Sequence, residues 1–171
     1  MKHVKLRALE PEDLDLLYRI ENDKELWDIS TTNVPYSRFL LHEYISNATG
    51  DIYADGQVRL IIENEDKTTI GIVDLTNFDA RNNRAELGLI IEKPYRNQGY
   101  GMSVLNEITS YCCSVLHLHQ LYVIIDEDNV ASLSLFEKYG FQKTAKLPDW
   151  LFDGKNYRQA VMMQKLIIPN Q

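Results

Sequence analysis

Apolar and polar residues alternate along three segments of this chain, and the alternation predicts β-strands. A two-residue period runs through residues 4–8, 58–62 and 85–91, so each of these would bury one face and expose the other, and residues 68–78 are expected to form a further strand. Short polar turns separate residues 58–62, 68–78 and 85–91 from one another. Strands joined by such turns pair with their neighbours, and we therefore expect these three to form an antiparallel meander.

A three- to four-residue apolar period predicts helices elsewhere in the chain. One helix begins at Pro11, which suits a first helical turn, and a second follows Pro35. A helix after Asn129 ends at Gly140, a residue common just beyond a helix C-terminus. Another follows Gly101 and is expected to bury one face, made of Leu105, Ile108, Cys112 and Val115.

Three further strands complete the pattern. Residues 121–125 are almost wholly apolar, which is typical of a strand in the middle of a sheet, and residues 142–147 and 157–166 form two more. The chain has no internal repeat and no segment rich in Gly, Ser and Pro. The order of elements predicts one α+β (mixed α/β) domain over residues 1–171, with seven strands and about four helices.

Composition narrows the functions to consider. The 171 residues are 44% hydrophobic and 25% charged, and the net charge of −7 disfavours charge-driven binding to nucleic acid or to an anionic membrane. The two cysteines, Cys112 and Cys113, are adjacent, which favours reduced thiols over a disulfide or a metal site. No apolar segment reaches the roughly 20 residues of a membrane span, so we expect a cytoplasmic protein.

The segment that precedes the third helix has the composition of an anion-binding loop. It reads Arg96-x-x-Gly99-x-Gly101. Glycine lets a ligand approach the backbone closely, and the first amides of the helix are unpaired and lie at the positive end of its dipole. With Arg96 as an added charge, the loop favours a phosphate or a pyrophosphate. The alternative is a tight turn without a ligand, and no Lys-Ser/Thr pair follows to make a P-loop.

This loop and a later pattern together resemble the signature of the GNAT N-acetyltransferases. That family has Gln/Arg-x-x-Gly-x-Gly/Ala after its fourth strand, as residues 96–101 have here. Its later pattern is matched by Asn129, Ser132, Phe136 and Gly140-Phe141. Within the family, residues 4–10, 84–86 and 153–158 look similar to spermidine N-acetyltransferases and to ribosomal-protein alanine N-acetyltransferases.

The resemblance implies a GNAT fold in which the fourth strand of a mostly antiparallel sheet splays from the fifth and acetyl-CoA lies in the gap. The pantetheine arm of the cofactor would pair with strand backbone as an added strand does. The pyrophosphate would lie on the glycine loop, and the later pattern would contact the cofactor arm. The cofactor-binding residues expected on this basis are Leu89, Ile90, Ile91, Arg96, Asn97, Gln98, Gly99, Tyr100, Gly101, Met102, Asn129 and Phe136.

Acetyl transfer to an amine requires that the ammonium group first lose a proton. Glu86 is the candidate base, and the alternatives are an exposed carboxylate or a salt bridge to Arg84. Many relatives have a tyrosine as general acid where this chain has Phe136, which has no proton to donate. Tyr139, one turn later, is a candidate acid whose alternative role is core packing, and water could protonate the thiolate instead. No metal site is expected.

The resemblance implies an acetyl-CoA-dependent N-acetyltransferase that acts on a primary amine, either a polyamine or another small amine. The alternatives are a ribosomal-protein N-terminal alanine acetyltransferase and an acyl-CoA-binding protein without catalysis. Spermidine enzymes carry acidic residues where this chain has Ser30 to Tyr36, which include none. Other negative charge would have to come from Asp28, Asp74, Asp149 and Asp153. The expected partners are acetyl-CoA and an amine or a protein N-terminus, without nucleic acid or membrane, and a homo-oligomer is left open.

Overall fold

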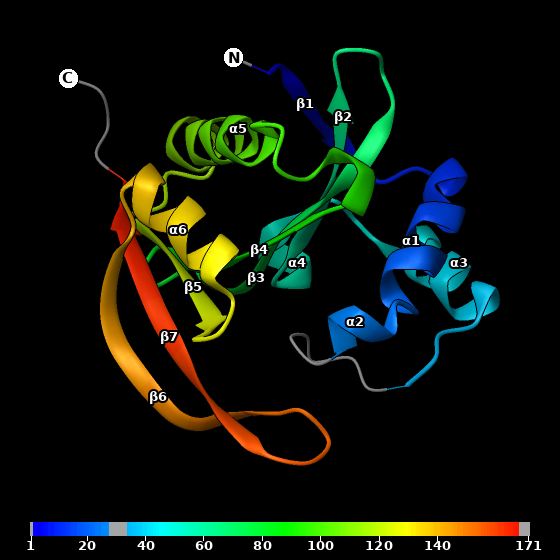
Figure 1. The fold of residues 1–171 in the computed structure, drawn as a ribbon. Coiled ribbons are helices and arrows are strands. Elements are labelled where there is room, and N and C mark those ends of the chain that lie inside the picture. Colours follow the sequence, from blue (N-terminus) through cyan, green and yellow to red (C-terminus); the bar gives the residue numbers. More distant parts are fainter. Residues whose placement is uncertain (1, 28–33, 168–171) are drawn as a thin grey trace.

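A computed structural model describes residues 2–27 and 34–167, and these form a seven-stranded sheet with helices on both faces (Figure 1). The strand order is β1-β2-β3-β4-β5-β7-β6, and every neighbouring pair is antiparallel except β4 and β5. The mixed α/β prediction and the antiparallel meander of β2, β3 and β4 are thereby confirmed. The strands are β1 (Val4–Ala8), β2 (Val58–Asn64), β3 (Thr69–Asp79), β4 (Arg84–Ile91), β5 (Gln120–Asp126), β6 (Gln142–Phe152) and β7 (Tyr157–Leu166).

The four predicted helices are present in the described residues. They are α1 (Leu14–Glu21), α3 (Arg38–Asn47), α5 (Tyr100–Ser114) and α6 (Val130–Tyr139). The helix predicted to begin at Pro11 starts as a 3-10 turn, η1 (Pro11–Asp13), whereas α2 (Lys24–Trp27), α4 (Ile52–Asp55) and the 3-10 turn η2 (Lys93–Tyr95), each a single turn, were not predicted. A single turn is too short to show a helical period, which explains why the sequence pattern missed them.

Two apolar clusters hold the helices to opposite faces of the sheet. On one face, α5 and α6 pack on the sheet through residues such as Leu105, Ile108 and Phe136. On the other face, α1 and α3 pack against Ile61, Ile72 and Ile90. Alternating side chains of β4 reach both clusters, because successive residues of a strand point to opposite faces.

The apolar face predicted for α5 is correct except at its end. Leu105, Ile108 and Cys112 are buried, but Val115 is 58% exposed and the next residue, Leu116, is buried in its place. Val115 is the C-cap of the helix, where the chain leaves the helical period. Both cysteines are free thiols, as predicted. Among the described residues, no helix combines the length and the hydrophobicity needed to cross a membrane.

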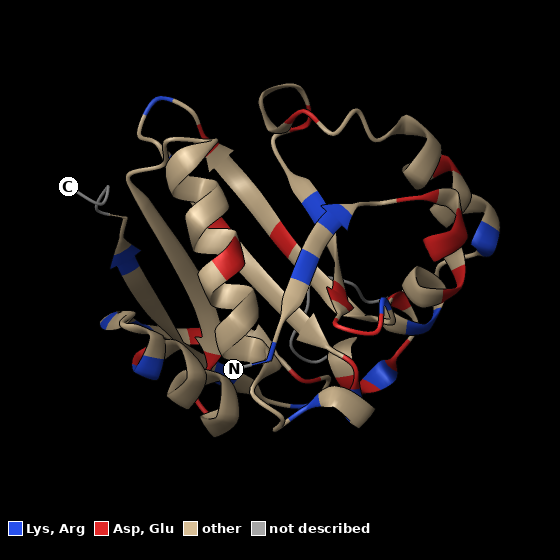
Figure 2. Cartoon of the chain, turned by 90° about the horizontal axis from the view of Figure 1, so that it is seen from above, with Lys and Arg blue, Asp and Glu red and all other residues tan. Residues whose placement is uncertain are grey.

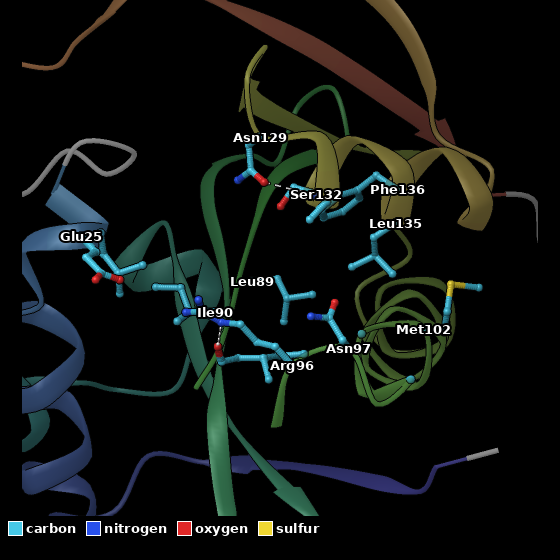
Figure 3. A pocket seen from close by; sticks show the side chains of 15 residues that line it. Glu25, Leu89, Ile90, Arg96, Asn97, Met102, Asn129, Ser132, Leu135 and Phe136 are labelled. Carbon is cyan, nitrogen blue, oxygen red and sulfur yellow. Dashed lines mark hydrogen bonds between the residues drawn. The ribbon is translucent and has the colours of Figure 1, made fainter. Parts of the chain in front are cut away.

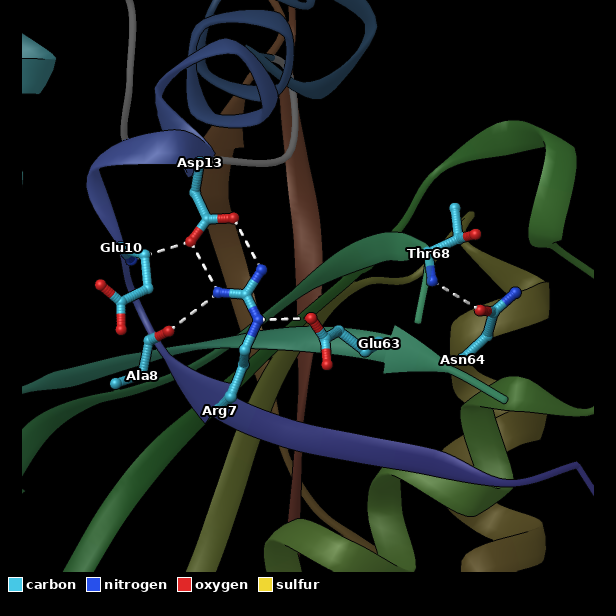
Figure 4. Close-up of polar contacts among 7 residues, drawn as sticks. All are labelled: Arg7, Ala8, Glu10, Asp13, Glu63, Asn64 and Thr68. Carbon is cyan, nitrogen blue, oxygen red and sulfur yellow. Dashed lines mark hydrogen bonds and ion pairs between the residues drawn. The ribbon is translucent and has the colours of Figure 1, made fainter. Parts of the chain in front are cut away.

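Acidic and basic residues are interspersed over the helices and strands (Figure 2), and one part-buried cluster of them anchors α1 to the sheet. Arg7 of β1 donates to both carboxylate oxygens of Asp13, at 2.8 and 2.9 Å, and its Nε donates to Glu63 of β2 at 2.6 Å (Figure 4). The backbone amide of Glu10 also donates to Asp13 at 2.8 Å. The Asp13 side chain is only 4% exposed, so its charge depends on these donors.

We predict that Asp13→Asn lowers the free energy of unfolding by roughly 3 kcal/mol, because it leaves the Arg7 guanidinium part-buried without its charged partner. Urea unfolding followed by circular dichroism measures this. The matched control is Lys143→Ala, which removes an ion pair of 4.0 Å between side chains that are both more than half exposed. It should change the free energy of unfolding by less than about 0.5 kcal/mol.

The contribution of Asp13 to the free energy of unfolding should also depend on pH. Burial opposes ionisation of this carboxyl, but hydrogen bonds from Arg7 and from the Glu10 amide outweigh it and hold the pKa of Asp13 below its usual value. The folded state therefore binds fewer protons than the unfolded state, and the stabilisation is complete above the unfolded pKa of roughly 3.9. The difference in unfolding free energy between the parent and Asp13→Asn should shrink as the pH falls below about 4. A difference that stays constant down to about pH 2 would contradict this.

Candidate active site

A cleft of about 380 Å³ lies where β4 and β5 separate, between the first turns of α5 and α6 and the end of α2 (Figure 3). Ten of the twelve residues expected from the sequence to contact a cofactor line it. They are Leu89, Ile90, Ile91, Arg96, Asn97, Gly99, Gly101, Met102, Asn129 and Phe136. The remaining lining residues are Glu25, Leu26, Ala131, Ser132 and Leu135.

The cleft exists because β4 and β5 pair over only three residues. Their parallel register ends at Glu86 and Tyr122, after which β4 continues along β3 alone as far as the Gly71–Ile91 pair. β5 meanwhile pairs with β7 along its whole length. The second half of β4 therefore has one edge without a strand partner, and its backbone groups there are available to a ligand.

The orientation of each β4 residue follows from its contacts with β3. The backbone amide of Glu92 donates to the carbonyl of Ile70 in β3 at 2.8 Å. The peptide bond between Ile91 and Glu92 is trans, so the carbonyl of Ile91 points the opposite way, into the cleft. The carbonyl of Ile90 instead faces β3. A Cβ atom added to Gly71, which belongs to β3, would lie 2.1 Å from the oxygen of this carbonyl. Leu89 and Ile91 thus present their backbone to the cleft, whereas Ile90 contributes only its side chain.

The loop before α5 leaves the first amides of the helix uncovered. Asn97 and Gly99 both have left-handed backbone angles, with φ of 59° and 89°. Gly99 is the N-cap of α5 and has no side chain to occupy the free amides. The Gln98 side chain folds back and donates to the carbonyl of Pro94 at 2.6 Å, which stabilises the turn. The loop is therefore shaped for an anion, as the residue types suggested.

The first turn of α6 forms the opposite wall. The side-chain oxygen of Asn129 accepts a hydrogen bond from the Ser132 amide at 3.1 Å, so this oxygen caps the helix and the NH₂ group is left for a ligand. Phe136 is 4% exposed and packs edge-to-face on Phe141 at 5.0 Å. Capping of the helix by the Asn129 oxygen is therefore compatible with the cofactor contact expected for this residue.

Four predicted site residues lie outside the lining of the cleft, namely Gln98, Tyr100, Tyr139 and Glu86. Gln98 is turned toward Pro94, as described above, and Tyr100 is 3% exposed with its hydroxyl 3.2 Å from Glu65 in the β2–β3 turn. Tyr139 packs beside Phe141 and below the Lys165 ammonium, which is 5.1 Å from the ring centre. These contacts favour the packing role of Tyr139 over general acid catalysis.

Glu86 lies at the point where β4 and β5 begin to diverge. It is on the sheet face opposite to Ala85 and Leu87 and does not line the cleft. Its Oε2 accepts a hydrogen bond from Asn77 at 2.7 Å. Tyr122 of β5 is its register partner, and burial together with the Glu86 charge raises the pKa of that phenol. The carboxylate is therefore on the same face of β4 as the Ile90 side chain, which lines the cleft.

The acidic residues considered for binding a cationic amine are largely engaged elsewhere. Asp74 accepts two hydrogen bonds from Arg59, at 2.7 and 2.9 Å. Asp153 accepts the Lys155 and Asn156 amides in the β6–β7 turn. Asp28 and residues 30–33 lie outside the described residues.

Glu25 is the charged cleft residue that sequence reasoning missed. It belongs to the single-turn helix α2, and its carboxylate pairs with Lys93 of η2 at 2.5 Å. The hydrogen bond from Lys93 lowers the pKa of Glu25, and the charge of Arg96 adds to this. No motif signals this residue, because its place in the cleft depends on how α2 packs.

Comparison with known proteins gives concordant results. Residues 3–142 match the sequence profile of the family described as acetyltransferase (GNAT) domain. Spermidine N(1)-acetyltransferase of Escherichia coli (strain K12) is 28% identical over 160 residues, which cover 94% of this chain and 84% of that protein.

Two solved structures have the same fold. Spermidine N-acetyltransferase from Vibrio cholerae in complex with CoA and spermine superposes with a TM-score of 0.84 at 26% identity, covering 96% of both chains. A dodecameric structure of spermidine N-acetyltransferase from Vibrio cholerae, in an intermediate state, gives a TM-score of 0.80 at 26% identity and covers 96% of this chain and 94% of that one.

We predict that Gly101→Ala weakens CoA binding about tenfold, a loss of ~1.4 kcal/mol. A Cβ at this position would lie 2.8 Å from Cδ2 of Leu135, so that side chain has to move within the cleft it lines. Stability should change by less than about 1 kcal/mol, because alanine also favours the helix. Isothermal titration calorimetry measures the affinity. Adding Leu135→Ala should restore most of it, and a double variant no better than Gly101→Ala would contradict the steric explanation.

Proposed function

The chain belongs to the acetyltransferase (GNAT) family and is an acetyl-CoA-dependent N-acetyltransferase, and we propose that the amine it acetylates is a polyamine. The observation that supports a site for the acetyl donor is that the glycine loop before α5 and the unpaired edge of β4 border the same cleft. Support for a polyamine comes from the relatives, since the Escherichia coli protein and the two Vibrio cholerae structures are all named for spermidine.

Acetyl-CoA supplies an activated acetyl group as a thioester, and the chain's own residues hold and orient it. We assign the amides at the start of α5 and the Arg96 guanidinium to the pyrophosphate. The backbones of Leu89 and Ile91 accept and donate hydrogen bonds as the edge of a sheet does, and the Asn129 amide group contacts the cofactor arm. Ile90, Leu135 and Phe136 exclude water from the apolar part of the cleft.

We assign Glu86 as the general base that takes a proton from the acceptor ammonium, directly or through a water. The hydrogen bond from Asn77 holds the carboxylate at the opening between β4 and β5. Phe136 has no proton to give, and Tyr139 is packed away from the cleft, so water protonates the departing thiolate in this proposal. The negative charge of Glu86 also favours a cationic acceptor.

Assembly and location complete the proposal. We infer a homo-oligomer, because the Vibrio cholerae relative has a dodecameric structure of matching fold. The cytoplasmic location expected from the sequence stays a prediction.

Acetyl transfer by the purified chain to a panel of amines tests the acceptor. With acetyl-CoA as donor, CoA thiol release should be at least about tenfold faster with spermidine or spermine than with lysine or an amino-terminal alanine peptide, measured as kcat/KM. A preference for the alanine peptide would overturn the polyamine assignment. Binding of acetyl-CoA without turnover on any amine would favour the non-catalytic alternative.

We predict that Glu86→Gln lowers kcat by about 10²–10⁴-fold, the usual effect of losing a general base, while the affinity for acetyl-CoA stays normal. The control is Glu107→Gln, which changes an exposed carboxylate of α5 that does not line the cleft and should keep kcat within about threefold. If Glu86→Gln loses less than about threefold, the acceptor is deprotonated by another group.

A further inference from the structure

The Arg96 side chain lies against the strand edge that the cofactor arm is proposed to use. Figure 3 shows the Arg96 side chain in the cleft. Its Nε donates to the carbonyl of Ile91 at 2.7 Å, and that carbonyl points away from β3 and into the cleft. In this arrangement the guanidinium occupies the last backbone acceptor on the open edge of β4. An amide of a bound ligand that pairs with Ile91 would meet Arg96 there.

Negative charge inside the cleft favours this inward position of Arg96. The Glu25 carboxylate lines the same cleft and interacts electrostatically with Arg96, while its own hydrogen bond is to Lys93. The Arg96 side chain is otherwise exposed, so no packing holds it in place. Its position therefore depends on which acceptor is strongest.

A phosphate group changes which acceptor is strongest. A guanidinium binds a phosphate through two parallel hydrogen bonds in which both partners are charged, whereas Arg96 makes one hydrogen bond to the Ile91 carbonyl, which is a neutral acceptor. The free amides of α5 would hold such a phosphate close to Arg96, five residues beyond Ile91 and on the same loop. A ligand that carries phosphate can thus draw Arg96 away from Ile91, and one that lacks phosphate cannot.

We propose that Arg96 makes the cleft selective for phosphate-bearing acyl carriers by covering the Ile91 carbonyl until a phosphate displaces it. Arg96 then acts in two opposite ways, as a ligand for CoA and as an obstacle to an unphosphorylated pantetheine. This inference rests on the proposed placement of the pantetheine arm along β4. Removal of the Arg96 side chain should consequently weaken the binding of CoA and strengthen the binding of unphosphorylated pantetheine.

The test compares the binding of pantetheine, 4′-phosphopantetheine and CoA to the full-length chain and to Arg96→Ala, by calorimetry without an acceptor amine. Arg96→Ala should bind pantetheine about three- to tenfold more tightly, the effect of freeing one hydrogen-bonded carbonyl from a charged donor. It should bind CoA about tenfold more weakly, from the loss of charge-assisted contacts. Arg96→Ala should therefore raise the affinity for pantetheine but lower the affinity for 4′-phosphopantetheine, which carries the first phosphate.

Arg19→Ala is the matched control, because it removes one exposed positive charge whose hydrogen bonds are to Glu92 and not to the β4 edge. It should leave pantetheine affinity unchanged. If Arg96→Ala binds pantetheine no better than the parent, the Ile91 carbonyl serves both donors at once and the proposal is overturned. Failure of the parent chain to bind CoA at all would instead refute the cofactor site under the proposed function.

Discussion

The separation of β4 from β5 is the constraint on which the rest of the structure depends. Both strands stay in one sheet, since β4 is paired with β3 and β5 with β7, yet they pair with each other over only three residues. Backbone groups at such an opening need partners, and α5 and α6 do not supply them. In the proposed function the pantetheine arm of the cofactor supplies these hydrogen-bond partners and so takes the place of a neighbouring strand.

Ion pairs on the other face hold α1 and its neighbours where they close the cleft. Arg59 of β2 joins Asp74 of β3 to Glu21 of α1, at 2.7 and 2.6 Å, and Arg7 joins β1 and β2 to the turn that precedes α1. α2 follows α1 directly and brings Glu25 to the cleft. These paired charges are only part-exposed and hold α1, which α2 follows, against the sheet.

Much of the fold could be predicted because it follows from local patterns. The alternation in residues 4–8 and 85–91 is the consequence of strand geometry, and Gly99, the N-cap of α5, has the left-handed angle that the loop requires. The pairing of a glycine loop with Asn129 and Phe136 also identified opposite walls of one cleft, although some thirty residues separate them in sequence. That success came from the family resemblance, because spacing alone does not indicate contact.

The sequence by itself determined which segments are strands and helices, which of their faces are apolar, and that a loop with the composition of an anion-binding site precedes α5. Only the tertiary structure decided which groups face the cleft. Pairing with β3 turns the Ile90 carbonyl away, burial turns Tyr100 inward, and the packing of α2 adds Glu25. The physical reason is that periodicity reflects sterics within a segment, whereas the direction of a carbonyl or a carboxylate is set by neighbours distant in sequence.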